Sequence, residues 1–545
     1  MHEEEMPGIP TSEIIGRGTW LDKLAQEIVA RERKIRRSSP VLRTESGFGC
    51  SGLPHIGSFG DAARAYGVAL SLQDQGHKSE FIAYSDDMDG LRRVPAGFPP
   101  SLKDYLGFPV SSIRDPWSCH ESYASHMDSL LLEALEEAGI EYTHLSATKM
   151  YRSGKFNPYI RKVLEKADRV GEIFEEETGQ EKYLLQLPYL PVCSNCGRIY
   201  TAKSKRYIPR EGKILYECEE EIVRGNLLRG CGYKGEADFT QGQGKVAWKA
   251  EFAVRWAALG INFEAYGKDI ADSVRANDRV CEEILETPAP YHIRYEIFLD
   301  KGGRKISKSI GNVLTPQLWY RYGSAQSLLL LMFKRYEGTR EISIVDVPKY
   351  MDELSRLGLI YSGRSVVKDE KERAKLRGLY EYSHLLHPPE EPPIYVPYRL
   401  LAHLIKVAPT AQSRDYVRDK LKEYGYIDEE LPANMDKYLE YVANWVRDFG
   451  AVQEEEVEAA EQELQAIQDL VAFLHTERTE DDIQAAVFSA ARGRGIRPGS
   501  LFRLVYQILL GDDHGPRIGP YIKTVGEKEV TSALERFLES KKKPT

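Results

Sequence analysis

Two short stretches of this sequence combine residues suited to holding a nucleotide. The first, Ser46–Ser58, reads SGFGCSGLPHIGS and lies between a β-like segment and a helical pattern that begins near Asp61. Its glycines let the backbone approach a ligand, and the start of the following helix offers N–H groups to an anion. An ordinary glycine-rich βα turn has the same features, so this stretch alone leaves both interpretations open. The second stretch, Lys301–Asn312, is basic and reads KGGRKISKSIGN after a strand-like run.

The pairing of the two stretches is more informative than either one alone. His55–Ser58 and Lys305–Ser309 resemble, in the expected order, the two signatures of class I aminoacyl-tRNA synthetases. The resemblance implies a split Rossmann fold, with ATP and its Mg²⁺ as a substrate. Ser58 stands where the fuller form of the first signature has a second histidine. This difference weakens the assignment of a role to position 58, but it does not weaken the assignment of the site.

The chemistry of amino-acid activation explains why these residue types are needed. The carboxylate of the amino acid attacks the α-phosphate of ATP, so negative charge shifts onto pyrophosphate and positioned donors stabilise it. His55 can donate to the phosphates, Gly57 leaves a flat surface for adenine, and the two lysines can close over the leaving group. Similarity to the family makes Lys308 the expected ATP contact. The expected catalytic residues are His55, Ser58, Lys305 and Lys308, and the further binding residues in these stretches are Gly49, Ser51, Gly52, Gly57, Ser307 and Ser309.

Size and charge limit the class of protein. A chain of 545 residues, of which 42% are hydrophobic and 29% charged, is long enough for about three to four domains. Its net charge of −9 argues against indiscriminate coating of nucleic acid, although a local basic face could still bind RNA. The apolar run Leu328–Phe333 is far too short to span a membrane, and the N-terminus lacks the features of a signal peptide. We therefore expect a cytoplasmic protein without a membrane segment, and we expect it to be a monomer.

An acidic turn follows the second predicted strand. Glu80–Tyr84 reads as a short buried strand, and Asp86, Asp87 and Asp89 come directly after it. Strand, nucleotide loop, helix and strand form a right-handed βαβ unit, in which ligands bind at the carboxyl ends of the strands. Asp86 or Asp87 can therefore hold the α-ammonium of the amino acid, and glutamyl and lysyl members of class I look similar here. A turn or a helix cap would use the same residue types, and this alternative stays open.

Four of the seven cysteines form a candidate metal site. Cys193 and Cys196 flank a knuckle, and Cys218 and Cys231 follow with looser spacing. Four thiolates make a closed tetrahedral site suited to structural Zn²⁺. The alternative, which stays open, is that two of the cysteines are ordinary buried thiols and the other two are incidental. The remaining cysteines, which we read as small apolar fillers, are Cys50, Cys119 and Cys281.

The region after these cysteines narrows the resemblance to one family. Gly244–Trp256, reading GKVAWKAEFAVRW, and Tyr266–Asp269, reading YGKD, are similar to the class I lysyl-tRNA synthetases. The resemblance covers the chain from about Trp20 to its C-terminus, and it implies L-lysine and tRNA(Lys) as further substrates. Ile270 departs from it, because several members have histidine there. Three more matching segments are Ser51–Gly57, Asp86–Arg92 and Ser146–Gly154.

A pocket for lysine must hold a four-carbon stem and an ammonium group. Burying that charge requires a carboxylate, an aromatic face or both. Trp248, Phe252 and Trp256 would also form a core stripe on any helix, so the role of Trp248 stays open. The candidate contacts are Trp248 and Tyr295 as aromatic walls, Ser51 at the substrate end, and Glu45 or Asp269 as the neutralising carboxylate.

The rest of the chain reads as helical. Residues 315–386 look like the stem-contact region that follows the second signature in class I enzymes, and the proline-rich 387–393 reads as a joint. The helices beyond it resemble the anticodon-binding domain of lysyl and glutamyl class I enzymes. Arg492, Arg494 and Arg497 lie there in glycine-bearing turns, where arginines grip phosphates, stack on unpaired bases or cap helices.

We therefore predict an α/β fold, with a split Rossmann catalytic domain built on a doubly wound parallel sheet. A zinc-bearing insertion interrupts this domain, and an all-α domain follows it. The expected boundaries are 1–154 for the N-terminal helix and the first half of the catalytic domain, 155–244 for an inserted acceptor-stem domain, 245–314 for the second half, 315–386 for the stem-contact region and 387–545 for the anticodon-binding domain.

The family resemblance implies a ligase that activates L-lysine with ATP to lysyl-adenylate and transfers lysine to the 3′ end of tRNA(Lys). Two alternatives remain. Another class I specificity, such as glutamyl or cysteinyl, would need an arginine for a carboxylate or a zinc ion in the active site for a thiol. A non-enzymatic zinc-bearing RNA-binding paralogue would keep the helices and the knuckle but need not keep both nucleotide signatures.

Overall fold

The computed structural model describes residues 14–296, 298–300, 314–390, 394–408, 413–432, 434–450, 457–476 and 478–542. Lys305, Ser307, Lys308 and Ser309 lie outside the described residues, and their roles stay predictions. The chain divides into two compact units, which we describe separately. The first unit runs to Gln317 and adds Leu329–Ser343 and Lys368–Pro388, while the second comprises Leu318–Leu328, Ile344–Val367 and the chain from Pro389 onward.

A five-stranded parallel sheet forms the centre of the first unit, in the order β12-β11-β1-β2-β3. Its strands are β1 (Leu42–Phe48), β2 (Ser79–Ser85), β3 (Thr143–Ser146), β11 (Ile261–Gly267) and β12 (Tyr291–Tyr295). From β1 the chain adds β2 and β3 on one side and later β11 and β12 on the other. The strand order therefore reverses between β1 and β11, which is where doubly wound sheets bind ligands. This arrangement confirms the predicted parallel sheet.

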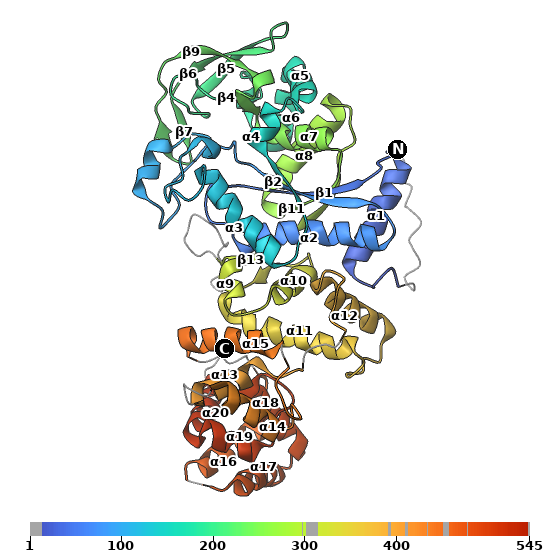
Figure 1. Cartoon of the computed structure of the whole chain (residues 1–545), viewed down its shortest axis with the longest axis vertical. Helices are drawn as coiled ribbons and strands as arrows, with labels where there is room; N and C mark the ends of the chain where they lie inside the picture. The colour runs from blue at the N-terminus through green and yellow to red at the C-terminus, as the bar shows by residue number, and fades with distance from the viewer. Residues whose placement is uncertain are drawn as a thin grey trace. The chain divides into compact units, whose positions relative to one another are not determined.

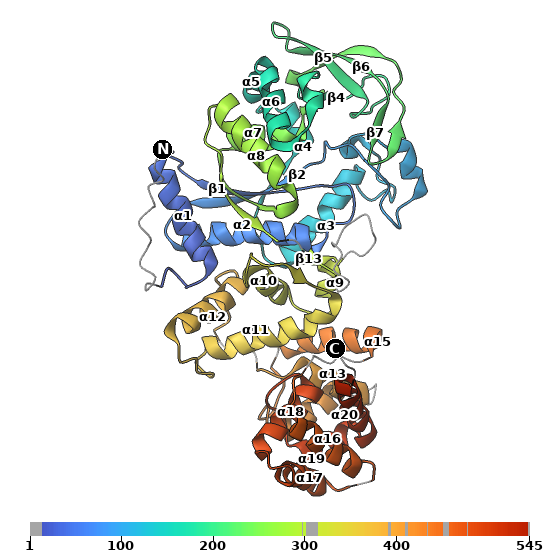
Figure 2. The ribbon, with the colours of Figure 1, turned by 180° about the vertical axis from the view of Figure 1, so that it is seen from behind.

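Helices cover both faces of this sheet. On one face lie α1 (Trp20–Lys34) and α2 (Ile56–Asp74), and on the other lie α7 (Trp248–Leu259) and α8 (Ala271–Arg279) (Figure 1). Figure 2 shows the same layers from behind. Most of α2 is buried, because small residues such as Ala62 and Ala65 let it pack closely against the sheet and against its neighbour α1. The start of α2 is thereby held at the carboxyl edge of β1.

The chain between β3 and β11 divides the sheet into its two halves. It begins with α4 (Ala147–Arg152), α5 (Asn157–Glu165) and α6 (Ala167–Thr178), and α5 and α6 share one hydrophobic core with α7 and α8. An antiparallel sheet follows, in which β6 (Lys213–Cys218) lies between β5 (Ala202–Ile208) and β9 (Lys234–Asp238). The insertion closes where β10 (Gly244–Val246) pairs with β4 (Tyr189–Pro191), directly before α7.

Two further helices complete the part of the first unit that matters for the site. The loop after β2 leads into α3 (Tyr123–Glu137), whose start is capped by Ser122. Much later in the chain, α12 (Glu370–Ser383) packs onto α1, where the Tyr382 hydroxyl donates to Asp22 at 2.7 Å. Residues 370–383, which we predicted within a stem-contact region, therefore belong to the compact unit that contains the sheet.

Beyond Pro397, all the regular secondary structure of the described residues is α-helical. The side chain of Trp445 is fully buried at its centre, against Tyr322 and Tyr398. This confirms the predicted all-α C-terminal fold, and the role of that fold stays a prediction. Among the described helices, none combines the length and the apolar character needed to cross a membrane. The described α-helices of this unit from Ile344 onward are α11 (Val347–Tyr361), α13 (Tyr398–Val407), α14 (Ser413–Glu423), α15 (Met435–Phe449), α16 (Glu461–Leu474), α17 (Glu480–Gly493), α18 (Pro498–Leu510), α19 (Ile518–Val525) and α20 (Glu527–Lys542).

Candidate active site

The loop after β1 places a histidine ring at the start of α2. His55 is the N-cap of this helix, and its Nδ1 accepts the backbone N–H groups of Gly57 at 3.0 Å and Ser58 at 3.3 Å. Because Nδ1 is an acceptor, a neutral His55 ring carries its proton on Nε2 and can donate from there. The positive end of the α2 dipole adds to this donor. The arrangement suits a phosphate or another anion.

Gly57 is required by this ring. A Cβ atom at Gly57 would lie 2.6 Å from Cε1 and 2.7 Å from Nδ1 of His55, far inside van der Waals contact. The side chain of a larger residue would therefore displace the capping histidine. This is a different reason for glycine from the flat adenine surface that the sequence suggested. Gly49 and Ser51 are exposed in the same loop, whereas Gly52 is buried.

The first described residue after the second signature contacts the same helix start. Residues 301–313 lie outside the described residues, but the carbonyl of the next residue, Leu314, accepts the N–H of Ile56 at 2.9 Å. Lys308 precedes Leu314 by six residues in the sequence. Six residues span at most about 21 Å when fully extended. The distance along the chain therefore allows Lys308 to reach an anion bound at the start of α2.

A cavity of about 80 Å³ opens at the switch point of the sheet, between the ends of β1, β11 and β12 and the helix α7. Aromatic side chains form much of its wall, and charged groups converge on it. The aromatic residues that line it are Phe252, Trp256, Tyr266 and Tyr295, and the charged ones are Asp61, Asp86, Arg255 and Glu264.

One buried guanidinium organises the carboxylates of this cavity. Arg255, which is 0% exposed, forms ion pairs with Glu45, with Asp86 at 3.4 Å and with Glu264 at 3.1 Å. Its guanidinium also lies 4.5 Å from the ring centre of Tyr84 and 4.8 Å from that of Phe252. Three carboxylates thus surround a single positive charge.

Ionised carboxylates are costly to maintain in this cavity. Burial raises the pKa of Glu45 and of Asp86 above their ordinary values, and the attraction of Arg255 only partly opposes this. Burial also raises the pKa of Asp61 to about 6, against the neighbouring Arg64. An incoming cation would stabilise the ionised carboxylates and be stabilised by the aromatic walls. The cavity is therefore suited to a ligand that carries an ammonium group.

The structure separates the two neighbouring aspartates that the sequence could not distinguish. Asp86 lines the cavity. The carboxylate of Asp87 instead accepts the hydroxyl of Ser146 and, at 2.7 Å, the N–H of Thr148, at the start of α4. These contacts are those of a helix cap.

Of the other residues predicted to contact lysine, some line the cavity and some do not. Tyr295 lines the cavity, and so does Ile270. Asp269 is exposed, one residue before Ile270. Trp248 is absent from the described residues that line the cavity and packs on Phe252, with ring centres 5.1 Å apart. The members of its helical stripe that reach the cavity are Phe252 and Trp256.

Sequence reasoning missed a buried lysine next to this site. The Nζ of Lys245, which is 1% exposed, lies 2.5 Å from Asp89 and 2.7 Å from Glu251. Burial opposes the charge of Lys245, but the two carboxylates outweigh burial and raise its pKa. The hydroxyl of Tyr151 donates to Glu251 at 3.2 Å. This network ties the acidic turn after β2 to α7, at the point where the insertion closes.

We expect Lys245→Met to lower the free energy of unfolding by about 3–5 kcal/mol, because the change leaves buried Glu251 without its cation. Urea denaturation of the purified variant measures this. The matched control is Lys23→Met on α1, whose side chain is 65% exposed and whose partner Glu27 is 3.8 Å away; it should change stability by less than about 0.5 kcal/mol. Equal stabilities for the two variants would contradict a structural role for the network.

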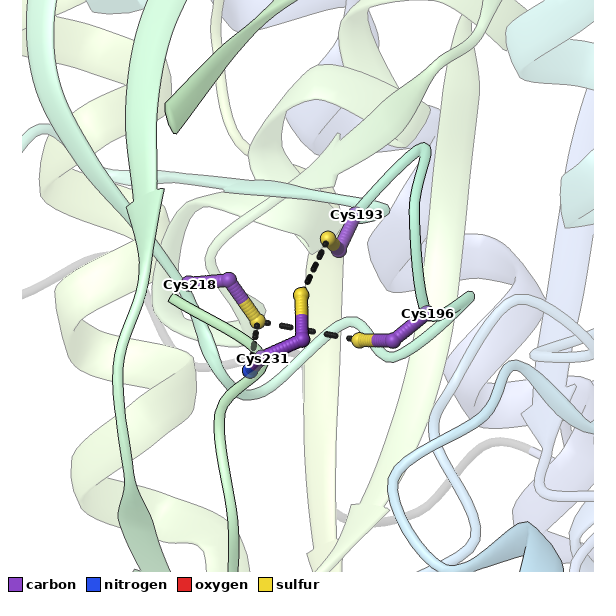
Figure 3. Close-up of side chains that lie close together, drawn as sticks. All are labelled: Cys193, Cys196, Cys218 and Cys231. Carbon is purple, nitrogen blue, oxygen red and sulfur yellow. Dashed lines mark hydrogen bonds between the residues drawn. The ribbon is translucent and has the colours of Figure 1, made fainter. Parts of the chain in front are cut away.

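The four predicted cysteines converge in the insertion (Figure 3). Sγ of Cys193 lies 3.6 Å from that of Cys231, and Sγ of Cys196 lies 3.6 Å from that of Cys218. Four thiolates bound about 2.3 Å from one zinc ion stand about 3.8 Å apart, whereas disulfide-bonded sulfurs stand about 2.05 Å apart. The donor set and the spacing therefore fit a closed tetrahedral zinc site.

A second group of metal-ligand side chains, which was not predicted from the sequence, lies outside the insertion. Cys119, which we had read as an apolar filler, is exposed, and that interpretation is wrong. Its Sγ lies 3.3 Å from Nδ1 of His120 and 3.2 Å from Nδ1 of His126, and buried Asp115 completes the group. The spacing Asp-x₃-Cys-His-x₅-His was the signal available in the sequence.

Comparisons with known proteins agree on one family. Residues 18–386, which build the sheet, the loop and the cavity, match the family model described as tRNA synthetases class I (K). A lysine–tRNA ligase of Cenarchaeum symbiosum (strain A) is 46% identical over 522 residues, which cover 96% of this chain and 99% of that relative. A lysine–tRNA ligase of Rickettsia bellii (strain RML369-C) is 30% identical over 508 residues, which cover 91% of this chain and 93% of that relative.

Proposed function

We propose that this chain, which belongs to the class I lysyl-tRNA synthetase family, is a lysine–tRNA ligase. It activates L-lysine with ATP, forming lysyl-adenylate and pyrophosphate, and then transfers the lysyl group to the 3′ end of tRNA(Lys). The observation that carries this proposal is the cavity beside the start of α2, where three carboxylates share one arginine. An excess of buried carboxylates selects a cationic amino acid.

Lysine binds in this cavity with its stem along the aromatic walls. Asp86 holds the α-ammonium, as the turn after β2 suggested, and the remaining carboxylates attract the ε-ammonium. Tyr295 and Trp256 flank the stem. Phe252 and Trp256 form the aromatic wall that the sequence had assigned to Trp248, on the same helix. The carboxylate of lysine then faces the nucleotide loop, since the loop leads directly from β1 to α2.

ATP binds at the loop Gly49–His55 and the start of α2. Nε2 of His55 and the helix dipole stabilise the phosphates, and Mg²⁺ accompanies them as part of the substrate. Lys305 and Lys308 close over pyrophosphate as it leaves, because the segment that carries them ends at Leu314, next to Ile56. The chemistry needs little covalent assistance, so positioning and charge stabilisation account for the rate.

The rival specificities predict other side chains. A glutamate pocket needs a guanidinium that is not already paired with carboxylates, whereas Arg255 has three such partners. A cysteine pocket needs a metal in the cavity, whereas the four-cysteine group belongs to the insertion and does not line the described cavity. ATP–pyrophosphate exchange with lysine, glutamate and cysteine, each with and without tRNA, tests the proposal. Of the three amino acids, we expect only lysine to support exchange. Exchange with glutamate or cysteine at a similar rate would refute the proposed function.

The insertion and the second unit bind the tRNA. The insertion, with Zn²⁺ bound by Cys193, Cys196, Cys218 and Cys231, contacts the acceptor stem. The second unit binds the anticodon loop, and Arg492 and Arg497 are exposed at the ends of α17 and α18 for that purpose. Arg494 is engaged with Asp469 at 2.7 Å, so it is the weaker candidate of the three. The cytoplasmic location and the monomeric state remain predictions.

A further inference from the structure

One carboxylate of the cavity forms no ion pair with Arg255. Asp61 lies in the second turn of α2 and lines the cavity. Its Oδ1 atom is buried, lies 3.6 Å from Nη1 of Arg64 and has no hydrogen-bond partner among the described residues. The side chain as a whole keeps 28% of its surface exposed, so a ligand in the cavity can reach it. The Asp61 carboxylate is therefore accessible and incompletely hydrogen-bonded.

Other carboxylates near the cavity are less available to a ligand. Both oxygens of Glu264 accept hydrogen bonds, one from the guanidinium of Arg255 at 3.1 Å and one from the indole N–H of Trp256. Glu45 is 0% exposed and is absent from the described residues that line the cavity. Asp269, which the sequence also suggested, is exposed and does not line the described cavity. None of these three carboxylates combines access to the cavity with a missing hydrogen bond.

Asp61 and Asp86 lie in different parts of the cavity wall. Asp61 belongs to α2, whereas Asp86 directly follows β2. Arg64 is the charged group that acts most strongly on the pKa of Asp61. For Asp86, this group is Arg255. Each carboxylate thus has its own guanidinium, and a ligand with two ammonium groups can contact both carboxylates.

The number of charged groups also suits a ligand with two ammonium groups. When all four carboxylates beside the two buried guanidinium groups are ionised, they exceed those groups by two charges. The α- and ε-ammonium groups of lysine can balance both charges, whereas a neutral amino acid balances one of them. These carboxylates are Asp61 beside Arg64, and Glu45, Asp86 and Glu264 around Arg255.

We propose that Asp61 accepts the ε-ammonium of lysine and determines the specificity for this side chain. Asp86 holds the α-ammonium, and the stem passes the ring of Tyr295, which lies 4.7 Å from the guanidinium of Arg64. Arg64 is a positioning residue, because it is 1% exposed, does not line the described cavity and favours the ionised form of Asp61. This inference rests on the proposed function, since it takes lysine as the substrate.

A comparison of two ligands separates the two ammonium contacts. L-norleucine has the α groups and the four-carbon stem of lysine but no ε-ammonium. Calorimetry gives the Kd for each ligand, by displacement where binding is weak, in the wild type and in three full-length variants. Asp61→Asn and Asp86→Asn each remove one charge of the cavity. Asp74→Asn is the matched control, because Asp74 ends α2 and pairs with Arg17 at 2.8 Å, outside the cavity.

We expect the wild type to bind lysine at least about a hundredfold more tightly than norleucine, as for a charge-assisted hydrogen bond. Asp61→Asn should reduce this preference at least about tenfold and change the Kd for norleucine less than about threefold. Asp86→Asn should raise both Kd values and leave the preference within about threefold of the wild type, because both ligands carry the α-ammonium. Asp74→Asn should match the wild type in both Kd values.

A wild type that prefers lysine, together with an Asp61→Asn variant that keeps this preference, would overturn the assignment of Asp61 and leave the proposed function standing. A wild type without a preference for lysine over norleucine would instead refute the proposed function.

Two further measurements apply if Asp61→Asn does not fold. The double variant Asp61→Asn/Arg64→Met leaves neither partner of the buried pair charged, and it should show the same loss of preference. In a crystal structure of the wild type with lysine, Nζ should lie within about 3.5 Å of the Asp61 carboxylate. An Nζ atom more than about 4 Å from both oxygens of Asp61 would overturn the inference.

Discussion

Lys308→Ala lowers the rate of lysine activation at least about a hundredfold, the largest loss that we expect from a single side chain. The ammonium of Lys308 meets the negative charge that develops on pyrophosphate, and this charge is greatest in the transition state. The loss should therefore fall mainly on kcat, with a smaller change in the KM for lysine. Lysine-dependent ATP–pyrophosphate exchange, with and without tRNA, measures both.

Lys301→Ala is the matched control for this variant. It removes the same charge from the same segment, but from outside the Lys305–Ser309 signature. We expect a change in kcat of less than about threefold, because nonspecific attraction by a basic segment contributes little in physiological salt. If the two variants lost equal activity, the segment would act only through its net charge, and the assignment of Lys308 would be wrong.

Asp86→Asn weakens lysine binding about a hundredfold. The substitution keeps the size of the side chain but removes a buried carboxylate that faces an ammonium group, and charge-assisted bonds of this kind contribute about 1.5–3 kcal/mol. The fold should persist, because Arg255 retains Glu45 and Glu264 as partners. Calorimetry gives the Kd for lysine and the Kd for ATP in the same variant, and the comparison separates a loss of lysine binding from a general loss of ligand binding.

Asp87→Asn is the control that the structure offers. Asp87 bonds to the start of α4, so its change should cost about 1 kcal/mol of stability and alter the Kd for lysine less than threefold. A hundredfold loss of lysine affinity in Asp87→Asn, with little effect of Asp86→Asn, would reverse the two assignments.

The pH dependence of lysine binding follows from the same carboxylate. Burial raises the pKa of Asp86 to about 8, so this group is largely protonated at pH 6 in the free protein. An ammonium group binds the ionised form, and the affinity for lysine should therefore rise as the pH increases from 6 and level off above about 8. The slope should become shallower in Asp86→Asn, where Glu45 and Asp61, whose pKa values burial also raises, still titrate. An affinity that falls over this range would contradict the role given to Asp86.

The features that could be predicted from the sequence are those with a local pattern. The alternation of buried strands with apolar helices such as Ala62–Ala69 indicated the parallel sheet. The acidic turn was predicted because it directly follows a strand end. The convergence of four cysteines followed from their ligand chemistry, although their spacing was loose.

The features that could not be predicted depend on contacts between distant segments. Arg255 pairs with three buried carboxylates from different segments, and no local pattern of the sequence shows that they share one partner. These carboxylates are Glu45 on β1, Asp86 after β2 and Glu264 on β11. On α7, Trp248, Phe252 and Trp256 follow one helical stripe, and only the packing of the helix decides which of them reach the cavity. Asp86 and Asp87 are adjacent, and the position of α4 alone assigns one to the cavity and the other to a cap.

A crystal structure with L-lysine and a non-hydrolysable ATP analogue tests the central claim most directly, since that claim is that the two signatures act on one nucleotide beside the acidic cavity. We predict the phosphates between His55 and Lys308, each within about 4 Å, and an ammonium group of lysine within about 3.5 Å of the Asp86 carboxylate. A structure in which Gly57 and Lys308 face separate spaces, or in which lysine binds away from Asp86 and Arg255, would contradict the claim.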